Sequence, residues 1–275
     1  MNLETIREKI KGPAFAIITP FTEGGKHVDW PAVERYTQFL YEGGAKVFYV
    51  MGYNSRFSIL SDTEIMQLNT VVTRTVKSYN DPDCVVIVAD PLHCSTQTSI
   101  DFAKHAEMIG ADVISLIFRE KVYFEEQVYN HYKEVSDNCN IGILIHEMPL
   151  NNGIPGQPPR IDLCDRLAVI TSGYGMKQWM KFTPHVHSWL SGTGGFNPAI
   201  EVDFYEAWLV NDIDKCNDII ENVELPFNTI KNRFGWHLGI KSAMHVMGVM
   251  DRQERMPLQQ LPDNDFKNLE KMMKE

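Results

Sequence analysis

The chain has 275 residues, of which 44% are hydrophobic and 23% are charged, and its formal net charge at pH 7 is −10. This length suits one α/β barrel, and the composition is that of a globular protein with enough apolar residues for a sizeable core. The acidic balance argues against nucleic acid as a partner, although a local arginine or lysine can still bind a small anion.

The N-terminal segment and the cysteines indicate the cellular compartment of the protein. The opening residues, MNLETIREKIKGP, carry charges of both signs and no apolar stretch, so we expect no signal peptide. No apolar run approaches the length of a membrane span, so we expect no membrane partner. The five cysteines are widely spaced and form no CxxC pair, which is typical of reduced, intracellular proteins. We therefore expect a cytoplasmic protein.

Short apolar runs recur along the chain and predict strands. They are continuously apolar rather than alternating, as expected for parallel strands that are covered on both faces. The predicted strands are residues 14–21, 46–52, 84–90, 112–118, 141–147, 167–173 and 188–194.

Amphipathic stretches between these runs predict helices. The stretch 29–44 opens with Asp29 as an N-cap and closes on two glycines, and 61–76 starts with the S-x-x-E pattern of a capping box. Strand–loop–helix units repeated about every 30 residues favour a doubly wound sheet or a (βα)8 barrel. Because no G-x-G-x-x-G follows the first strand, the barrel is preferred. Two further helices are predicted at 95–111 and 123–136.

The C-terminal part of the chain reads as helical. From residue 197 on, amphipathic stretches follow one another without a strand-like run, whereas 151–160 is a loop rich in Gly, Pro and Asn. We predict a βα barrel over 1–196 and helices over 197–275 that complete and cap it as a single structural unit. The three predicted helical stretches are 197–212, 212–234 and 239–251.

Several segments resemble one enzyme family. The quoted pieces are GPAFAIITPFTEGGKHVDW, GGAKVFYVMGYNSRFSILSDTE, HAEMIGADVISLIF, ILIHEMP and GIKSAMHVMGVMDRQERMPLQQL. They are spread over nearly the whole chain and are similar to the dihydrodipicolinate synthase / N-acetylneuraminate lyase family of class I aldolase-type barrels. The resemblance implies a TIM-type barrel without a cofactor or metal, a small 2-keto acid as substrate, and a homo-oligomer.

The resemblance also implies where the chemistry lies. In this family a pyruvate-type keto acid forms a Schiff base with a lysine at the end of strand six. A tyrosine at the end of strand five relays protons, and a hydroxyl pair after strand two holds the carboxylate. Active sites of such barrels lie at the carboxyl ends of the strands, which explains why the run 141–147 ends in the polar residues His146 and Glu147.

This chain departs from the family pattern at these positions. Tyr53 and Asn54 stand where the hydroxyl pair belongs, and Ser55–Arg56 replace the family's usual Gly-Glu. Asn54 can still donate to a carboxylate, and Arg56 could bind one with two hydrogen bonds. His146 stands in place of the tyrosine and can transfer protons near neutral pH.

Two alignments compete for the lysine. In the first, 166–177 is the end of a helix and strand six, and Lys177 is the Schiff-base lysine. In the second, the run 167–173 is strand seven, Lys177 belongs to the following loop or helix, and the unit with the imine lysine is absent. Both leave the chain short by about one βα unit. The segment GYGM is too rich in glycine for a central strand, which favours the second alignment.

Other residues at predicted strand ends are candidates for substrate binding. Glu147 follows His146, Arg119 follows the fourth run, and Gly192 lies in a turn that opens a helix, where an anion can bind. Asp90 and His93 have metal-ligating side chains, but their spacing matches no ligand motif, so we predict no metal site.

Two functions therefore remain. The leading hypothesis is a lyase that makes or breaks a carbon–carbon bond through an imine with a 2-keto acid, with Lys177 as nucleophile and His146 as proton relay. Tyr53, Asn54, Arg56, Arg119, Glu147 and Gly192 are the predicted substrate-binding residues. The alternative is a catalytically inactive family member that acts as a binding or assembly module, or an incomplete form of a longer active enzyme.

Overall fold

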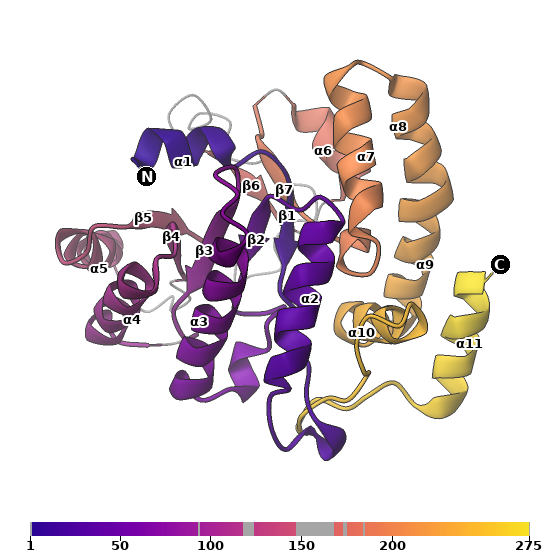
Figure 1. Cartoon of the computed structure of the whole chain (residues 1–275), viewed down its shortest axis with the longest axis horizontal. Coiled ribbons are helices and arrows are strands. Elements are labelled where there is room, and N and C mark those ends of the chain that lie inside the picture. Colours follow the sequence, from indigo (N-terminus) through magenta and orange to yellow (C-terminus); the bar gives the residue numbers. More distant parts are fainter. Residues whose placement is uncertain are drawn as a thin grey trace.

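A curled parallel sheet forms the centre of the molecule (Figure 1). The computed structural model describes residues 2–92, 94–117, 124–146, 168–172, 175–183 and 185–274. Within these residues the sheet has seven strands in the order β5-β4-β3-β2-β1-β7-β6. The strands are β1 (Gly12–Ala16), β2 (Val47–Tyr49), β3 (Val85–Ala89), β4 (Val113–Leu116), β5 (Gly142–Ile145), β6 (Ile170–Thr171) and β7 (Ser188–Leu190).

The strand order is that of a barrel opened between β5 and β6. Strand β1 pairs in parallel with β2, where Ala14 lies opposite Val47, and with β7, where Ala14 lies opposite Leu190. Strands β5 and β6 are the two edges of the described sheet. The predicted α/β class with parallel strands is therefore confirmed, and the described sheet is a half-barrel rather than a closed eight-stranded barrel.

Every predicted strand is found, but each is shorter than its apolar run. The first run was expected to extend over 14–21, and β1 ends at Ala16; the run 46–52 is a strand only over Val47–Tyr49. The last residues of these runs leave the sheet and form the loops that follow the carboxyl ends of the strands. Apolarity alone could not distinguish a ladder residue from a buried loop residue, because both are excluded from water.

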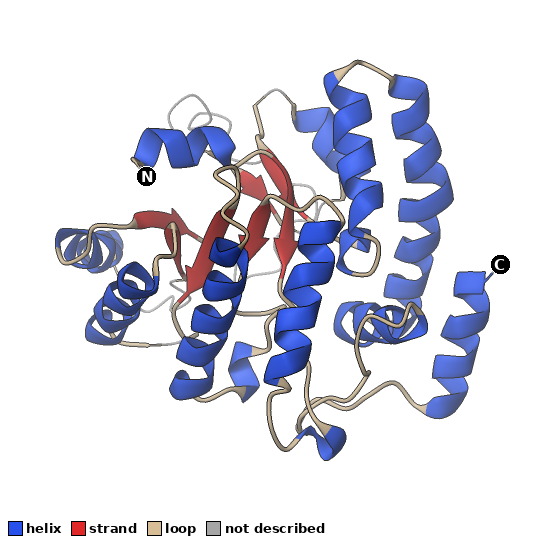
Figure 2. Cartoon of the chain, in the orientation of Figure 1, coloured by secondary structure: helices blue, strands red, loops and turns tan. Residues whose placement is uncertain are grey.

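Helices cover the outer face of the sheet, as Figure 2 shows. Asp29 caps the first of them through its side chain, and Ser61 and Glu64 form the predicted capping box of the next. Helix α1 (Leu3–Lys9) was not predicted; its Ile6 packs with Ala14 and Val47 in the interior cluster of the barrel. The outer helices are α2 (Trp30–Glu42), α3 (Asp62–Ser78), α4 (Thr96–Ile109) and α5 (Glu125–Asp137).

The C-terminal part is helical and packs beside β1 and β7 (Figure 1). A five-residue π-helical turn, Ile220–Glu224, joins α8 to α9. Within the described residues every helix is too short or too polar to cross a membrane. The helices are α6 (Met176–Phe182), α7 (Pro198–Leu209), α8 (Ile213–Ile219), α9 (Leu225–Phe234), α10 (Trp236–Val246) and α11 (Asp263–Lys274). Helix α11 was not predicted, and the sequence left the residues of α6 open as a strand end, a loop or a helix.

Candidate active site

Three polar side chains meet inside the barrel near the strand ends. The Tyr49 hydroxyl lies 2.7 Å from Oγ of Ser115 and 3.1 Å from Nδ1 of His146. Burial raises the pKa of the Tyr49 phenol above its ordinary value, so the phenol keeps its proton. A phenol has one proton to donate and can also accept, so the three groups form a hydrogen-bonded chain across β2, β4 and the end of β5.

Only one member of this chain was predicted. His146 is half-buried and directly follows β5, as expected from the sequence. Tyr49 and Ser115 were missed, although each is a polar residue within an otherwise apolar strand. A side chain with a hydroxyl group inside a buried strand needs a hydrogen-bond partner. This requirement was the signal in the sequence from which a polar cluster around Tyr49 and Ser115 could have been predicted.

Arg56 is fully buried, and its hydrogen bonds go to other parts of the chain. Nη2 and Nε donate to Oε1 of Glu254 over 2.8 and 3.1 Å. Nη1 donates to the carbonyl of Asn54 and lies 2.8 Å from Nδ1 of His237. Arg56 thus pairs with a carboxylate of the chain, and its binding of a substrate carboxylate stays a prediction. Ser55–Arg56 stand where the family usually has Gly-Glu, so this chain has a positive charge at the position of the glutamate. Glu254 neutralises the charge of Arg56.

The turn after β7 also binds a carboxylate of the chain. Gly192 and Gly194 donate their backbone N–H groups to Oε1 of Glu201 on α7, each over 2.8 Å. Thr193 donates its hydroxyl to the same oxygen, and the Trp189 indole donates to Oε2. The turn thus binds a carboxylate of the chain itself, and the contact of Gly192 with substrate stays a prediction.

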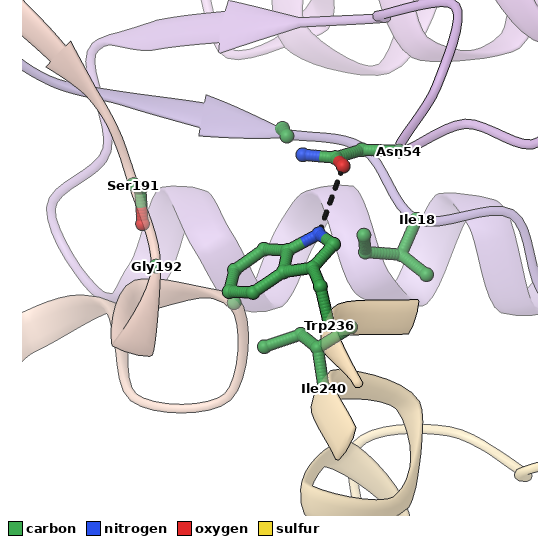
Figure 3. A pocket seen from close by; sticks show the side chains of 8 residues that line it. Ile18, Asn54, Ser191, Gly192, Trp236 and Ile240 are labelled. Atoms are coloured by element: carbon green, nitrogen blue, oxygen red, sulfur yellow. Dashed lines mark hydrogen bonds between the residues drawn. The ribbon is translucent and has the colours of Figure 1, made fainter. Parts of the chain in front are cut away.

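A small pocket lies where β1, the loop after β2 and the turn after β7 meet α10 (Figure 3). Its cavity volume is about 10 Å³, which is room for roughly one water molecule. Its polar groups are the Asn54 amide and the Ser191 hydroxyl, and the Trp236 indole donates to Oδ1 of Asn54 over 3.0 Å. The lining residues are Ala16, Ile18, Asn54, Ser191, Gly192, Gly195, Trp236 and Ile240.

Lys177 lies outside the barrel interior. It is the second residue of α6, its side chain is exposed, and its backbone N–H donates to Oε2 of Glu224 over 2.9 Å. In the described part of the sheet, strand β6, which precedes it, pairs with β7 and lies at the opposite edge from β5. This pairing agrees with the second alignment, in which Lys177 belongs to the helix after the strand. Its role as an imine nucleophile stays a prediction.

The remaining candidates are dispersed. Tyr53 is half-buried and packs against the interior cluster. His93, Arg119 and Glu147 lie outside the described residues. Asp90 is buried after β3, and among the described residues no group of three or more acidic, His or Cys side chains could hold a metal.

Comparison with known proteins places the chain in a family. The model of the "Dihydrodipicolinate synthetase family" matches residues 9–182. The 4-hydroxy-tetrahydrodipicolinate synthase of Thermodesulfovibrio yellowstonii is 24% identical over 294 residues, which cover 96% of this chain and 97% of that protein. The corresponding enzyme of Thermotoga sp. (strain RQ2) is 21% identical over 298 residues, which cover 96% and 98%.

Solved structures show the same fold. Dihydrodipicolinate synthase from Bacillus clausii superposes with a TM-score of 0.82 at 20% identity, covering 98% of each chain. The enzyme from Acinetobacter baumannii, in complex with pyruvate, gives a TM-score of 0.80 at 21% identity and covers 96% of this chain and 98% of that one. With more than half of its length matched by the family model, this chain belongs to the dihydrodipicolinate synthetase family of aldolase-type lyases.

Proposed function

We propose that this protein is a lyase that acts on a pyruvate-like 2-keto acid, with His146 as the proton-transferring residue. The hydrogen-bonded chain of His146, Tyr49 and Ser115 carries the proposal. It lies at the strand ends of an α/β barrel-type sheet, where active sites of this architecture are found. Histidine is suited to accept and return a proton near neutral pH. The bound pyruvate of the Acinetobacter relative supports a keto acid as ligand.

The nucleophile of the proposed reaction is Lys177. Strand β6 ends at Thr171 and helix α6 begins at Met176, so Lys177 follows the carboxyl end of a strand, the end at which active sites lie. Its exposed side chain lacks the desolvated surroundings that usually activate an imine lysine. The geometry therefore supports the proton-transfer part of the reaction more strongly than the nucleophilic part.

A second candidate function is a family member that binds its ligand without turning it over. Arg56 and the turn at Gly192 are both engaged by carboxylates of the chain, and Lys177 is exposed. We propose further that the βα unit with the family's imine lysine is absent. In support of this, β6 and β7 pair with each other and lead back to β1, and the Thermotoga alignment spans more positions than this chain has residues. The chain would then be an inactive member or an incomplete form of a longer enzyme.

Borohydride trapping with pyruvate distinguishes the two functions. The lyase proposal predicts a reduced adduct in intact mass and its assignment to Lys177 by peptide mapping. Lys177→Ala should abolish the adduct, whereas Lys181→Ala, an exposed lysine on the same helix, should leave it unchanged. If the folded protein binds pyruvate and no lysine is trapped, the lyase proposal is wrong and the binding function stands.

Substitution of His146 tests the proton relay. We expect His146→Ala to lower the rate of the lyase reaction with the keto acid that forms the adduct by about 10²-fold or more. This is the usual contribution of a general acid–base group. Pyruvate binding measured by calorimetry should change little. His185→Ala, an exposed histidine after α6, is the control. Equal turnover in both variants would exclude His146 from the reaction.

We also propose that the protein is cytoplasmic, as its cysteine pattern indicates, and that it forms a homo-oligomer, as the resemblance implies. Light scattering coupled to size exclusion tests the assembly, and a mass equal to one chain would contradict it.

A further inference from the structure

The hydrogen bonds that join Ser115, Tyr49 and His146 can run in either of two directions. The phenol of Tyr49 is the middle member, 2.7 Å from Oγ of Ser115 and 3.1 Å from Nδ1 of His146. Each hydroxyl has one proton to donate, and a neutral imidazole has one N–H group and one acceptor nitrogen. The direction that gives every buried donor an acceptor is therefore the one that the chain adopts.

The phenol of Tyr49 meets the Nδ1 edge of the His146 ring. The two rings are tilted by 50° and their centroids are 6.3 Å apart, so the contact is made by the hydroxyl group and not by stacking. A ring turned by 180° would present a carbon atom to the phenol and would lose this hydrogen bond. Nδ1 is therefore the nitrogen that shares a proton with Tyr49.

The two directions place the ring proton of His146 on different nitrogens. In the first, Ser115 donates to Tyr49 and Tyr49 donates to Nδ1, so every hydroxyl proton has an acceptor and the ring proton is on Nε2. In the second, Nδ1–H donates to Tyr49 and Tyr49 donates to Ser115. The proton of Ser115 then lacks an acceptor among the described residues, because its Oγ bonds only to Tyr49 there.

Burial decides in favour of the first direction. Ser115 is 2% exposed and Tyr49 is 3% exposed, so solvent water does not supply the acceptor that the second direction lacks. A buried donor without an acceptor loses its hydration and gains no hydrogen bond in return. Burial also raises the pKa of the Tyr49 phenol, so the phenol keeps a proton that it must donate.

We infer that Tyr49 is a positioning residue that holds neutral His146 in the tautomer with its proton on Nε2, so that His146 meets the ligand as a hydrogen-bond donor. A ligand atom that reaches Nε2 must then be an acceptor, such as the keto oxygen of a 2-keto acid. The inference rests on the proposed function for the identity of this ligand. Tyr49 acts through His146 and need not touch the ligand itself.

Two substitutions have opposite expected results. Tyr49→Phe keeps the ring and removes the hydroxyl group, so Nδ1 of His146 loses its donor and we expect both tautomers. Ser115→Ala leaves Nδ1 as the acceptor for the phenol, so the ring proton should stay on Nε2. Tyr36→Phe is the matched control, because Tyr36 is also buried and its hydroxyl donates to the carbonyl of Ala16.

The measurement is a long-range proton–nitrogen NMR correlation spectrum of the full chain with isotope-labelled histidine, above about pH 8, where an ordinary histidine is neutral. The signals of His146 are those that His146→Ala removes. In the wild type, Ser115→Ala and Tyr36→Phe, Nε2 should have the shift of a protonated nitrogen and Nδ1 that of an unprotonated one. In Tyr49→Phe the two shifts should move toward each other. Pyruvate should shift the Nε2 signal of the wild type.

The outcomes separate this inference from the proposed function. A wild type or Ser115→Ala with the proton on Nδ1, or a wild type with shifts as averaged as those of Tyr49→Phe, overturns the inference, and borohydride trapping still decides the proposed function. If calorimetry shows that pyruvate binds and the Nε2 signal does not move, the donor role toward the ligand is wrong. If the tautomers are as expected, pyruvate shifts the signal and no adduct is trapped, the inference stands and the lyase proposal fails. The wild-type and Ser115→Ala spectra test the inference even if circular dichroism shows that Tyr49→Phe is unfolded.

Discussion

Asp90 is a buried carboxyl group that the proposed chemistry does not use. It follows β3, is 2% exposed, and accepts hydrogen bonds at Oδ2 from Ser99 at 2.7 Å and Cys94 at 3.4 Å. Its other oxygen, Oδ1, has no hydrogen-bond partner among the described residues. Burial raises the pKa of Asp90 from 3.8 to about 6. Asp90 therefore makes the stability of the protein depend on pH.

We expect the free energy of unfolding to fall as the pH rises from about 4 to about 6. The folded state binds the Asp90 proton more tightly than the unfolded state, so this contribution is complete below the unfolded pKa and is lost as the pH passes the folded one. A shift of this size corresponds to about 3 kcal/mol. Asp90→Asn should remove the dependence, and Asp101→Asn, on the exposed face of α4, should retain it. Urea denaturation at pH 4, 5 and 6.5 measures the effect, and equal slopes in the wild type and Asp90→Asn would contradict it.

At the scale of elements, the turn after β7 depends on one carboxylate from α7. Three donors from residues 192–194 converge on Oε1 of Glu201, and the Trp189 indole holds Oε2. Because Glu201 is 1% exposed, each of these donors would lose its partner in a dry environment if the carboxylate were removed. The turn also lines the pocket.

Glu201→Gln should lower the free energy of unfolding by about 1–3 kcal/mol. The amide can accept at one oxygen only, and its NH₂ group then faces a donor of the turn or of Trp189. The control is Glu206→Gln, an exposed position on the same helix, which we expect to change stability by less than about 0.5 kcal/mol. Chemical denaturation of both variants measures the difference, and equal stabilities would show that the turn does not depend on the charge.

At the scale of the whole molecule, a buried ion cluster joins the N-terminal and C-terminal parts. Glu254 lies 2.8 Å from Arg56 and 3.3 Å from Lys241, and all three side chains are almost completely buried. Lys241 also donates to the carbonyl of Thr19 and lies over the Phe21 ring. Burial lowers the pKa of Lys241 to about 8, although Glu254 favours its charged form. The loop after β2 is thus fastened to the segment after α10.

Glu254→Gln should destabilise the protein by about 3–5 kcal/mol, because it leaves two buried cations without a counter-charge. The matched control is Glu34→Gln, which breaks the exposed pair with Arg74 and should cost about 0–1 kcal/mol. Denaturant titration of both variants provides the comparison. If Glu254→Gln were no less stable than the control, the cluster would not contribute to folding.

Local patterns in the sequence predicted the elements well. The apolar runs located all seven described strands, and the caps at Asp29 and Ser61 marked helix starts to within a residue. These features depend on residues a few positions apart in the chain, so the sequence alone is sufficient to predict them. Helix α1 was missed because it is short, and its Ile6 gains a partner only when the sheet curls over it.

The sequence by itself determined the α/β class, the family resemblance, and the presence of His146 and Asn54 at strand ends. Only the tertiary structure decided what these residues contact. Tyr49 links Ser115 to His146, Trp236 orients Asn54, and Arg56 pairs with Glu254. The physical reason is that a hydrogen bond requires two atoms within about 3 Å in the right orientation. For residues far apart in the chain, that proximity is created by the packing of the strands and helices and leaves no periodic trace in the sequence.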